Sequence, residues 1–333
     1  MINAAFILGT SAFADIYGEE SLRAIAPAAR LLGPPCTTAQ LQAAPPSWLA
    51  EVEVLFTGWD APRLDGDLLA RMPRLRAVFY GAGSIRPIAS DALWERGIVV
   101  ASAAALNAQP VVEFTLGAIL LSFKRAWHHA RLVRTERSYE PLRALAVPTG
   151  WGATIGLVSL GLIGRRVAEQ LRAYDVRVLG HDPLLDAAQF AALGVTPVSL
   201  AEIFDRSDII SLHTPLLPET TGVIDAGLLG RLRPGATLIN TARGGLVREA
   251  DLVATLLARP DVQAILDVTD PEPPARESPL YDLPNVFLTP HIAGSIGAEC
   301  RRMGRAMVDE FHRYVRGESL RYTVTREQLA RMA

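Results

Sequence analysis

Short runs of aliphatic and β-branched residues alternate with amphipathic stretches along most of the chain. In the N-terminal part, such runs predict buried strands at residues 4–8, 52–56, 77–80 and 98–100. After Gly150 the alternation becomes clearer, and it predicts strands at residues 154–158, 176–179, 208–212, 236–240, 262–267 and 286–288. Strands that alternate with helical patterns are typical of βαβ units, so we expect an α/β protein with parallel sheets.

Two longer helical patterns are predicted to connect two domains. The first runs from Pro110 to about Arg131 with Asn107 as its N-cap, and the second runs from Ile296 to Arg316. If the chain crosses twice, residues 1–102 and 294–333 share one domain and residues 103–293 form the other. A length of 333 residues, half of them hydrophobic, also favours two domains over one.

Charge and composition exclude several function classes. The 33 basic and 35 acidic residues leave a net charge of −2, which gives no long-range field for nucleic acid or an anionic membrane. Lys124 is the single lysine, so Schiff-base chemistry and Walker-type phosphate loops have almost no candidate residue. We therefore expect a small-molecule partner.

Cysteine usage and the N-terminus bear on location. Cys36 and Cys300 are far apart and in no metal or redox spacing, which is typical of a reducing compartment, so we expect a cytoplasmic protein without a metal site. The N-terminal apolar stretch lacks a basic region before it, so no signal peptide is predicted. No run reaches the roughly 18 apolar residues that a membrane span requires.

The stretch GLVSLGLIG, residues 156–164, follows a predicted strand and opens a predicted helix. Gly161 and Gly164 occupy the second and third glycine positions of a dinucleotide loop, where close approach to pyrophosphate and close helix packing exclude a side chain. Ser159 stands at the first position, which a serine can hold if its φ is negative. The free N–H groups at the helix start would face an anion. The loop predicts cofactor contacts from Ser159, Leu160, Gly161, Leu162 and Ile163.

An acidic residue lies at the spacing expected for ribose recognition. The strand after the loop ends in GHDP, which places Asp182 where a carboxylate accepts from adenosine ribose hydroxyls and favours NAD over NADP. A degenerate glycine loop alone is more often an ordinary turn, and Asp-Pro alone is a turn former, but their coincidence favours a dinucleotide site. Pro183 and Leu184 cannot pair with a 2′-phosphate, whereas Arg165 and Arg166 leave NADPH open as an alternative.

Three further predicted strands end in residues suited to acid–base chemistry. Arg243 lies in INTARGG, Glu272 in DVTDPEP and His291 in TPHIAGS, and carboxyl ends of parallel strands meet in one crevice. Each residue alone is equally well explained as a salt-bridge partner, a solvated acid or a structural histidine. Together they fit hydride transfer to a 2-keto acid. A guanidinium binds a carboxylate through two hydrogen bonds, a protonated histidine supplies the proton, and a carboxylate orients the imidazole.

An ordered series of motifs resembles the D-isomer-specific 2-hydroxyacid dehydrogenases, in particular the phosphoglycerate-dehydrogenase-like members. It comprises NAQPVVEFT (107–115), SLGLIG (159–164), HDP (181–183), SLHTPLLPETTG (211–222), INTARGG (239–245), DVTDPEP (267–273) and TPHIAGS (289–295). The resemblance covers nearly the whole chain. It implies two Rossmann-like domains, with the NAD-binding domain inserted into a flavodoxin-like substrate domain and usually forming the contact of a homodimer.

The resemblance also implies roles for individual residues. Arg243 would bind substrate, His291 would be the acid/base and Glu272 its partner. Substrate would also meet the backbone amides of the YGAGS loop, through Gly81, Ala82, Gly83 and Ser84, together with Arg243 and His291. The cofactor would further contact His213, Thr214, Pro215, Thr241, Ala242, Arg243, Asp267 and His291.

The expected function is therefore an NAD-dependent D-2-hydroxyacid dehydrogenase or 2-keto acid reductase. An NADPH-dependent glyoxylate or hydroxypyruvate reductase and a non-catalytic, NAD-responsive corepressor-like protein stay open as alternatives. The segment after Gly83 reads SIRP, which departs from the family pattern, so the substrate itself cannot be carried over. We hypothesise that Arg86 meets a second anionic group of the substrate; a solvent-facing arginine is the alternative.

Overall fold

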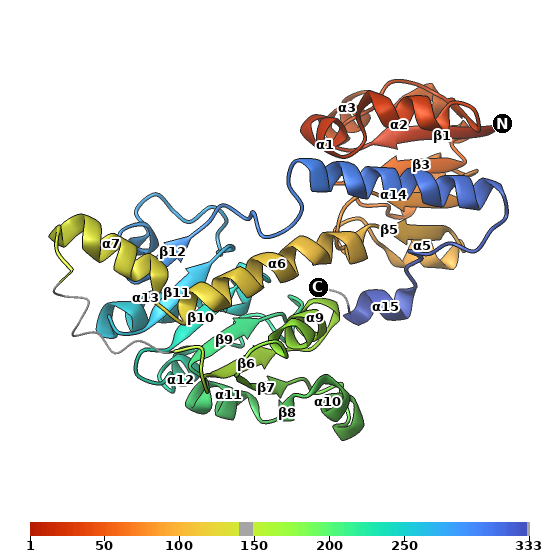
Figure 1. The fold of residues 1–333 in the computed structure, drawn as a ribbon. Helices are drawn as coiled ribbons and strands as arrows, with labels where there is room; N and C mark the ends of the chain where they lie inside the picture. The colour runs from red at the N-terminus through yellow and green to blue at the C-terminus, as the bar shows by residue number, and fades with distance from the viewer. Residues whose placement is uncertain (140–148, 332–333) are drawn as a thin grey trace. The chain divides into compact units, whose positions relative to one another are not determined.

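The computed structural model describes residues 1–139 and 149–331. The chain forms two compact units: residues 1–110 with the segment that begins at Ser295, and the inserted unit Val111–Gly294. Figure 1 labels their helices and strands. Both are α/β structures with parallel sheets, which confirms the predicted fold class. The helix α6 (Ala104–Ser122) runs through the division, and the boundary predicted at residue 102 stays a prediction.

The first unit contains a five-stranded sheet in the order β2-β1-β3-β4-β5, which is the flavodoxin-like order. Its strands are β1 (Ile2–Ile7), β2 (Ala29–Leu31), β3 (Val54–Thr57), β4 (Ala77–Tyr80) and β5 (Val99–Ser102). Its helices are α1 (Thr10–Ile16), α2 (Gly18–Ile25), α3 (Thr38–Ala43), the 3₁₀ helix η1 (Ser47–Glu51), α4 (Gly66–Arg71), α5 (Asp91–Glu95), α14 (Ala298–Val315) and α15 (Arg326–Arg331).

Stacked aromatic rings fix one face of this sheet. Phe6, Phe56 and Phe79 are register partners on β1, β3 and β4, with ring centroids 4.9 and 5.5 Å apart. Phe311 of α14 meets the Phe56 ring edge-on at 5.3 Å. Aromatic pairs of this geometry add to the stability that burial provides, so they attach α14, which lies after the inserted unit in sequence, to strands that lie before it.

The inserted unit contains a seven-stranded sheet in the order β12-β11-β10-β9-β6-β7-β8. Its strands are β6 (Thr154–Val158), β7 (Arg177–His181), β8 (Thr196–Pro197), β9 (Ile209–Leu212), β10 (Thr237–Asn240), β11 (Gln263–Leu266) and β12 (Val286–Leu288). Its helices, besides α6, are α7 (Ala126–Glu136), α9 (Leu162–Leu171), α10 (Ala187–Leu193), α11 (Leu200–Arg206), α12 (Ala226–Leu229), α13 (Glu249–Ala258) and the 3₁₀ helices η2 (Gly244–Leu246) and η3 (Pro279–Tyr281). The strand order reverses between β6 and β9, and ligands of open α/β sheets bind at such a point.

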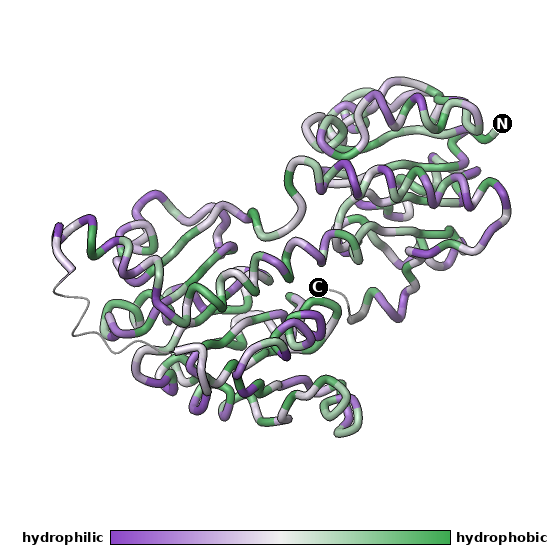
Figure 2. Tube along the Cα trace, in the orientation of Figure 1, coloured by the Kyte–Doolittle hydropathy of each residue, from purple (hydrophilic) through white to green (hydrophobic). Residues whose placement is uncertain are grey.

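The central strands are buried on both faces, as their continuous apolar runs predict. Figure 2 shows hydrophobic residues gathered along the strands of both units. Every predicted strand is present, and no end is shifted by more than two residues. The edge strands β2 and β8 were missed, because three and two residues carry too little pattern to be recognised.

The predicted first connector helix is wrong at both ends. The helix α6 begins at Ala104, whose N–H donates to the Ser102 hydroxyl at 3.1 Å, so Asn107 is a helical residue rather than the N-cap. The helix ends at Ser122, and Arg125 adopts a left-handed φ of 47° before α7 begins. Apolar periodicity continues across this break, which is why the sequence predicted one helix where the structure has two.

Among the described helices, α6 has the length and apolar composition that a membrane span needs. A buried helix in the core of a water-soluble protein meets the same criterion. Val112, Ala118 and Ile119 of α6 belong to the core cluster that also contains residues of β6 and α9.

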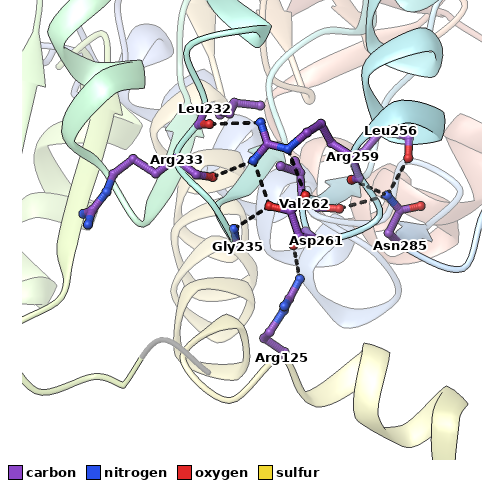
Figure 3. Close-up of polar contacts among 9 residues, drawn as sticks. All are labelled: Arg125, Leu232, Arg233, Gly235, Leu256, Arg259, Asp261, Val262 and Asn285. Carbon is purple, nitrogen blue, oxygen red and sulfur yellow. Dashed lines mark hydrogen bonds and ion pairs between the residues drawn. The ribbon is translucent and has the colours of Figure 1, made fainter. Parts of the chain in front are cut away.

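A polar network joins the amino ends of β10, β11 and β12 (Figure 3). Arg259 donates to both carboxylate oxygens of Asp261 at 2.9 and 2.8 Å, and the N–H of Gly235 donates to the same carboxylate at 2.9 Å. These bonds lower the pKa of Asp261 to about 2. The Asn285 side chain donates to the carbonyls of Leu256, Arg259 and Val262. The network therefore ties together the starts of three strands whose opposite ends carry the candidate site.

Candidate active site

The carboxyl ends of six strands in the inserted unit lie in one row. His181, Val158, Leu212, Asn240, Leu266 and Leu288 are register partners across β7, β6, β9, β10, β11 and β12. The residues that follow them directly are Asp182, Ser159, His213, Thr241, Asp267 and Thr289. All of these except Thr289 were predicted for the site, so parallel pairing places the predicted cofactor segments along one sheet edge.

Ser159 has a positive φ of 71°, so the expectation of a negative φ is wrong. The turn therefore uses the left-handed conformation that glycine adopts at the first position of this loop, at a cost of roughly 1–2 kcal/mol for a residue with a Cβ atom. Its N–H donates to the His181 carbonyl at 2.8 Å, and its hydroxyl lies 2.9 Å from that of Thr214. These bonds hold the serine in the strained turn.

Gly161 and Gly164 lack side chains for different reasons. A Cβ atom on Gly164 would lie 2.2 Å from the Ser159 carbonyl oxygen, so close packing of α9 against the loop excludes one. A Cβ atom on Gly161 would meet nothing within 4 Å. Gly161 is the N-cap of α9 without a side-chain capping bond, so open space lies beside the helix start. This arrangement fits the close approach of a pyrophosphate to backbone N–H groups.

Asp182 is held in one orientation by the backbone. Its carboxylate oxygens accept from the N–H groups of Leu160 at 2.8 Å and Leu184 at 2.9 Å. A carboxylate has further lone pairs, so it can still accept from ribose hydroxyls. The Leu160 side chain is fully buried, and Arg165 donates its Nε to the Leu160 carbonyl at 2.7 Å. Leu160 thus supports the loop from behind.

His213 forms a buried, uncharged wall behind the glycine loop. Its ring lies 3.4 Å from the position that a Cβ atom on Gly164 would take. Burial lowers the pKa of His213 to about 4. Its Nε2 has no hydrogen-bond partner among residues 1–139 and 149–331. A protonated ring at this position would be desolvated without compensation, so His213 is neutral at pH 7.

The structure brings together His291 and Glu272, which the sequence predicts as an acid/base and its partner. The Nδ1 atom of His291 lies 2.6 Å from Oε1 of Glu272, and both side chains are nearly half exposed, at 47% and 43%. His291 has a positive φ of 53°. Its N–H contacts the carbonyls of Asp267 at 2.9 Å and Thr289 at 3.0 Å. With Nδ1 engaged by the carboxylate, Nε2 is the ring atom available to a ligand.

Asp267 holds the loop that carries His291. This carboxylate is 1% exposed and accepts from the Thr289 hydroxyl at 2.6 Å and from the N–H groups of Ile292 and Ala293 at 2.8 Å each. Bonds to an ionised acceptor are about twice as strong as neutral ones, so they can offset the left-handed backbone of His291. The sequence predicted Asp267 at the cofactor, and it missed both this supporting role and Thr289.

Arg243 lies on a loop that contacts the loop of Glu272. The Asn240 side chain donates to the Arg243 carbonyl at 2.9 Å and accepts from the Ala242 N–H at 3.1 Å, which fixes the turn. A Cβ atom on Gly244 would lie 2.0 Å from the carbonyl group of Thr269. The backbones after β10 and β11 therefore touch, and Arg243, Glu272 and His291 lie on three neighbouring loops joined by direct contacts.

The Thr241 hydroxyl, beside Arg243, lies 2.9 Å from that of Thr115 on α6, and both residues are buried. This contact attaches the Arg243 loop to the helix. The sequence analysis did not identify Asn240, Gly244 and Thr115 as supporting residues. An amide and a glycine that flank the arginine at a strand end could have indicated the first two.

The predicted substrate loop belongs to the first unit. Gly81, Ala82 and Gly83 are buried and Ser84 is partly exposed. The N–H groups of Gly83 and Ser84 donate to no acceptor in the described part of the chain, whereas the Gly83 carbonyl accepts from the Ser102 hydroxyl at 2.7 Å. Gly83 is buried, and a buried N–H group without an acceptor is uncommon in native proteins and marks a place for a ligand or water.

Arg86 lies just after this loop and donates to the Leu329 carbonyl at 2.7 Å. It is therefore neither a solvent-facing side chain nor one directed only at substrate. In the described ranges, no group of three or more His, Cys, Asp or Glu side chains could hold a metal ion.

Replacing Ser159 separates backbone strain from hydrogen bonding. Ser159→Ala loses the contact with Thr214 and keeps a Cβ atom at positive φ, whereas Ser159→Gly loses the same contact and removes the strain. We expect the glycine variant to be more stable than the alanine variant by about 1 kcal/mol, measured by urea unfolding. Equal stabilities would contradict a strained turn.

The buried His213 predicts a loss of stability in mild acid. The folded-state pKa of about 4 lies below the ordinary value of 6.5, so the unfolded chain binds this proton first as pH falls from 6.5 to 4. The free energy of unfolding should decrease by about 2 kcal/mol at pH 5 relative to pH 7.5 through this residue.

His213→Gln removes this dependence. Urea unfolding measures the free energy of unfolding of both proteins at pH 7.5 and pH 5. Between these pH values, wild type should lose about 2 kcal/mol more than the variant. A pH-independent difference for His213→Gln would contradict the prediction.

Comparison with known proteins agrees with the geometry. Residues 116–293 match the family described as D-isomer specific 2-hydroxyacid dehydrogenase, NAD binding domain. D-3-phosphoglycerate dehydrogenase of Mycobacterium tuberculosis is 33% identical over 78% of this chain and 48% of its own length. (S)-Sulfolactate dehydrogenase of Chromohalobacter salexigens is 36% identical over 75% of this chain and 81% of its own. The chain thus spans about half the length of the phosphoglycerate dehydrogenases that it matches.

Solved structures show the same fold. The TT0316 protein of Thermus thermophilus superposes with a TM-score of 0.79, at 27% identity over 97% of this chain and 100% of that one. An NAD complexed form of a D-isomer specific 2-hydroxyacid dehydrogenase from Lactobacillus delbrueckii reaches 0.76 at 20% identity, covering 97% and 100% of the two chains. An acyclic imino acid reductase (Bsp5) with NADPH and D-Arg also reaches 0.76, at 22% identity and 98% and 100% coverage.

Both nicotinamide cofactors therefore occur on this fold. Three observations lead to one assignment. Adjoining loops carry Arg243, Glu272 and His291, a glycine loop leaves open space at a helix start, and the family match covers most of the inserted unit. The chain belongs to the D-isomer-specific 2-hydroxyacid dehydrogenase family of NAD(P)-binding oxidoreductases.

Proposed function

We propose that this protein is an NAD-dependent D-2-hydroxyacid dehydrogenase that interconverts a small 2-hydroxy acid and its 2-keto acid. The observation that carries the proposal is the 2.6 Å contact between His291 and Glu272 at the strand ends where the Arg243 loop also lies. An imidazole oriented by a carboxylate supplies an acid/base, and a guanidinium on the adjoining loop supplies an anchor for a carboxylate.

We propose a separate role in the reaction for each residue of the site. Arg243 binds the substrate carboxylate, and Nε2 of His291 holds the proton that moves to or from the C2 oxygen. Glu272 keeps the ring oriented through Nδ1. The nicotinamide, when bound, supplies or accepts the hydride at C2. The resemblance implies further contacts between the carboxylate and the loop of Gly81, Ala82, Gly83 and Ser84. The Gly81 N–H already donates to the Thr57 carbonyl at 2.8 Å, so we propose that the N–H groups after Gly81 provide them.

We propose NAD rather than NADP as the cofactor. Asp182 is fixed by two backbone N–H groups at the end of β7, where its negative charge would oppose a 2′-phosphate. The Nε atom of Arg165 donates to the Leu160 carbonyl, so this nitrogen is already engaged and does not favour binding of a 2′-phosphate. The remaining cofactor contacts are proposed as predicted, along Ser159–Ile163, His213–Pro215, Thr241–Arg243, Asp267 and His291.

We also propose a cytoplasmic homodimer formed through the inserted unit. Its support is the family resemblance, the two free and buried cysteines, and the helix α7, which contains no buried residue although it is part of this unit. Sedimentation of the purified protein at micromolar concentration measures the oligomeric state.

A substrate screen tests the proposed activity. Because the relatives named above act on 3-phosphoglycerate and (S)-sulfolactate, these acids belong in the panel with glyoxylate, hydroxypyruvate and simple aliphatic 2-keto acids. Turnover is followed through NADH absorbance, and each acid is tested with both cofactors. Preference for NADPH would favour the glyoxylate or hydroxypyruvate reductase alternative. NADH fluorescence that changes on binding without any turnover would favour a corepressor-like protein.

Removing the proton donor should abolish most of the activity. His291→Gln keeps a polar side chain of similar size but cannot transfer the proton, so kcat should fall by about 10² to 10⁴. The variant should still bind NADH, measured by fluorescence, because the other proposed cofactor contacts are unchanged. His312→Gln is the matched control and should keep wild-type kcat. A His291→Gln variant with more than a tenth of wild-type kcat would falsify the assignment.

A further inference from the structure

The C-terminal tail, residues 320–331, packs along the first unit next to the predicted substrate loop. Glu310 of α14 is 1% exposed, and its carboxylate accepts from the N–H groups of Arg321 at 2.7 Å and Tyr322 at 3.0 Å. The tail then pairs with β5, where Thr323 forms an antiparallel bridge with Ala101. A buried carboxylate and a strand edge thus fix the start of the tail.

The helix α15 ends the tail with its own anchors. Thr325 and Gln328 exchange side-chain and backbone hydrogen bonds of 2.9 and 3.2 Å, which is a capping box at the helix start. Arg326 forms an ion pair with Asp91. Leu329 packs against the core cluster that contains Ile85 and Ile88, the residues on either side of Arg86 and Pro87.

Two hydrogen-bonded links join the tail to the Gly81–Arg86 segment. At one end, the Ser102 N–H donates to the Tyr322 carbonyl at 2.9 Å, and the Ser102 hydroxyl donates to the Gly83 carbonyl at 2.7 Å. At the other end, Arg86 donates to the Leu329 carbonyl at 2.7 Å. Leu329 lies in the last turn of α15, where carbonyls lack helical partners and a cationic side chain is favourable.

We propose that the C-terminal tail holds the Gly81–Arg86 loop in its substrate-binding conformation, with Arg86 as the positioning residue. The inference rests on the proposed function, in which the loop amides bind the substrate carboxylate. The carbonyl of Gly83 is fixed from behind by Ser102, which leaves the N–H groups of Gly83 and Ser84 without an acceptor in the described chain. Amides held in place before binding cost no ordering entropy when the carboxylate arrives.

This assignment replaces the hypothesis that Arg86 meets a second anionic group of the substrate. A guanidinium bonded to a helix carbonyl acts on the substrate through the loop. Replacing Arg86 should therefore weaken the binding of every 2-keto acid to the same extent, whether the acid has one anionic group or two. The substrate anchor that Arg86 supports would be the same in the ground state and the transition state, so its loss should appear in KM rather than kcat.

The experiment compares the keto-acid kinetics of Arg86→Met, Arg86→Lys and a chain shortened after Thr325, which lacks α15. The control is Arg96→Met, because Arg96 also donates to backbone carbonyls of the first unit, those of Leu69 and Met72. We expect KM to rise about tenfold in Arg86→Met and in the shortened chain, since a charge-assisted bond of this kind changes binding by about one decade. We expect kcat to stay within about twofold. Arg86→Lys should recover part of the loss, and Arg96→Met should keep wild-type KM.

Combining Arg86→Met with the shortened chain tests whether the two act through one contact. The double variant should have the KM of the shortened chain alone, because Arg86 then has no Leu329 carbonyl to lose. A KM in the double variant that has risen by the product of the two single-variant factors would overturn the inference. A wild-type KM in Arg86→Met would also overturn it. A rise in KM confined to dianionic acids would return Arg86 to direct substrate contact and also overturn it.

Amide hydrogen exchange gives a readout that does not depend on turnover. Exchange of the loop between residues 81 and 86 should accelerate in Arg86→Met and in the shortened chain, with the strands β3 and β4 unchanged and Arg96→Met like wild type. Unchanged loop exchange overturns the inference whatever the kinetics show. A wild-type protein without turnover on any acid instead overturns the proposed function, so the two failures are distinguishable.

Discussion

The candidate site depends on the shared register of six parallel strands in the inserted unit. Because their last residues are paired in one row, each following residue starts from the same sheet edge. The polar network of Asp261 and Asn285 ties the opposite ends of β10, β11 and β12. A slip of one residue in any strand would turn every side chain in it to the other face. Loops only a few residues long can therefore bring Arg243, Glu272 and His291 to adjoining positions.

Backbone strain and buried polar groups occur together along this edge. Ser159 and His291, each just beyond a strand, adopt left-handed backbone conformations without being glycine. Each is held by hydrogen bonds from neighbouring strand ends, to His181 and Thr214 in one case and to Asp267 in the other. His213 adds an uncharged imidazole that burial keeps neutral. Such unfavourable features persist where surrounding structure determines them, and they are characteristic of binding and catalytic sites.

The first unit applies the same physical principle to a different loop. Backbone N–H groups can serve a ligand only if the chain around them is fixed and does not turn them to its own acceptors. Ser102 and Arg86 hold the two ends of the Gly81–Arg86 loop, and both are bonded to the C-terminal tail. A segment more than 200 residues away in sequence thus contributes to the geometry of this loop.

The sequence by itself determined the fold class, the main strands and the residue types of the site, because apolar runs mark buried strands and motifs mark their ends. It could not determine the positive φ of Ser159, the break after Ser122 or the short edge strands, since local pattern does not encode backbone dihedrals imposed by neighbours. Only the tertiary structure assigned Asp267 to the His291 loop and Arg86 to Leu329. Those roles depend on contacts between segments distant in sequence, which composition and spacing cannot reveal.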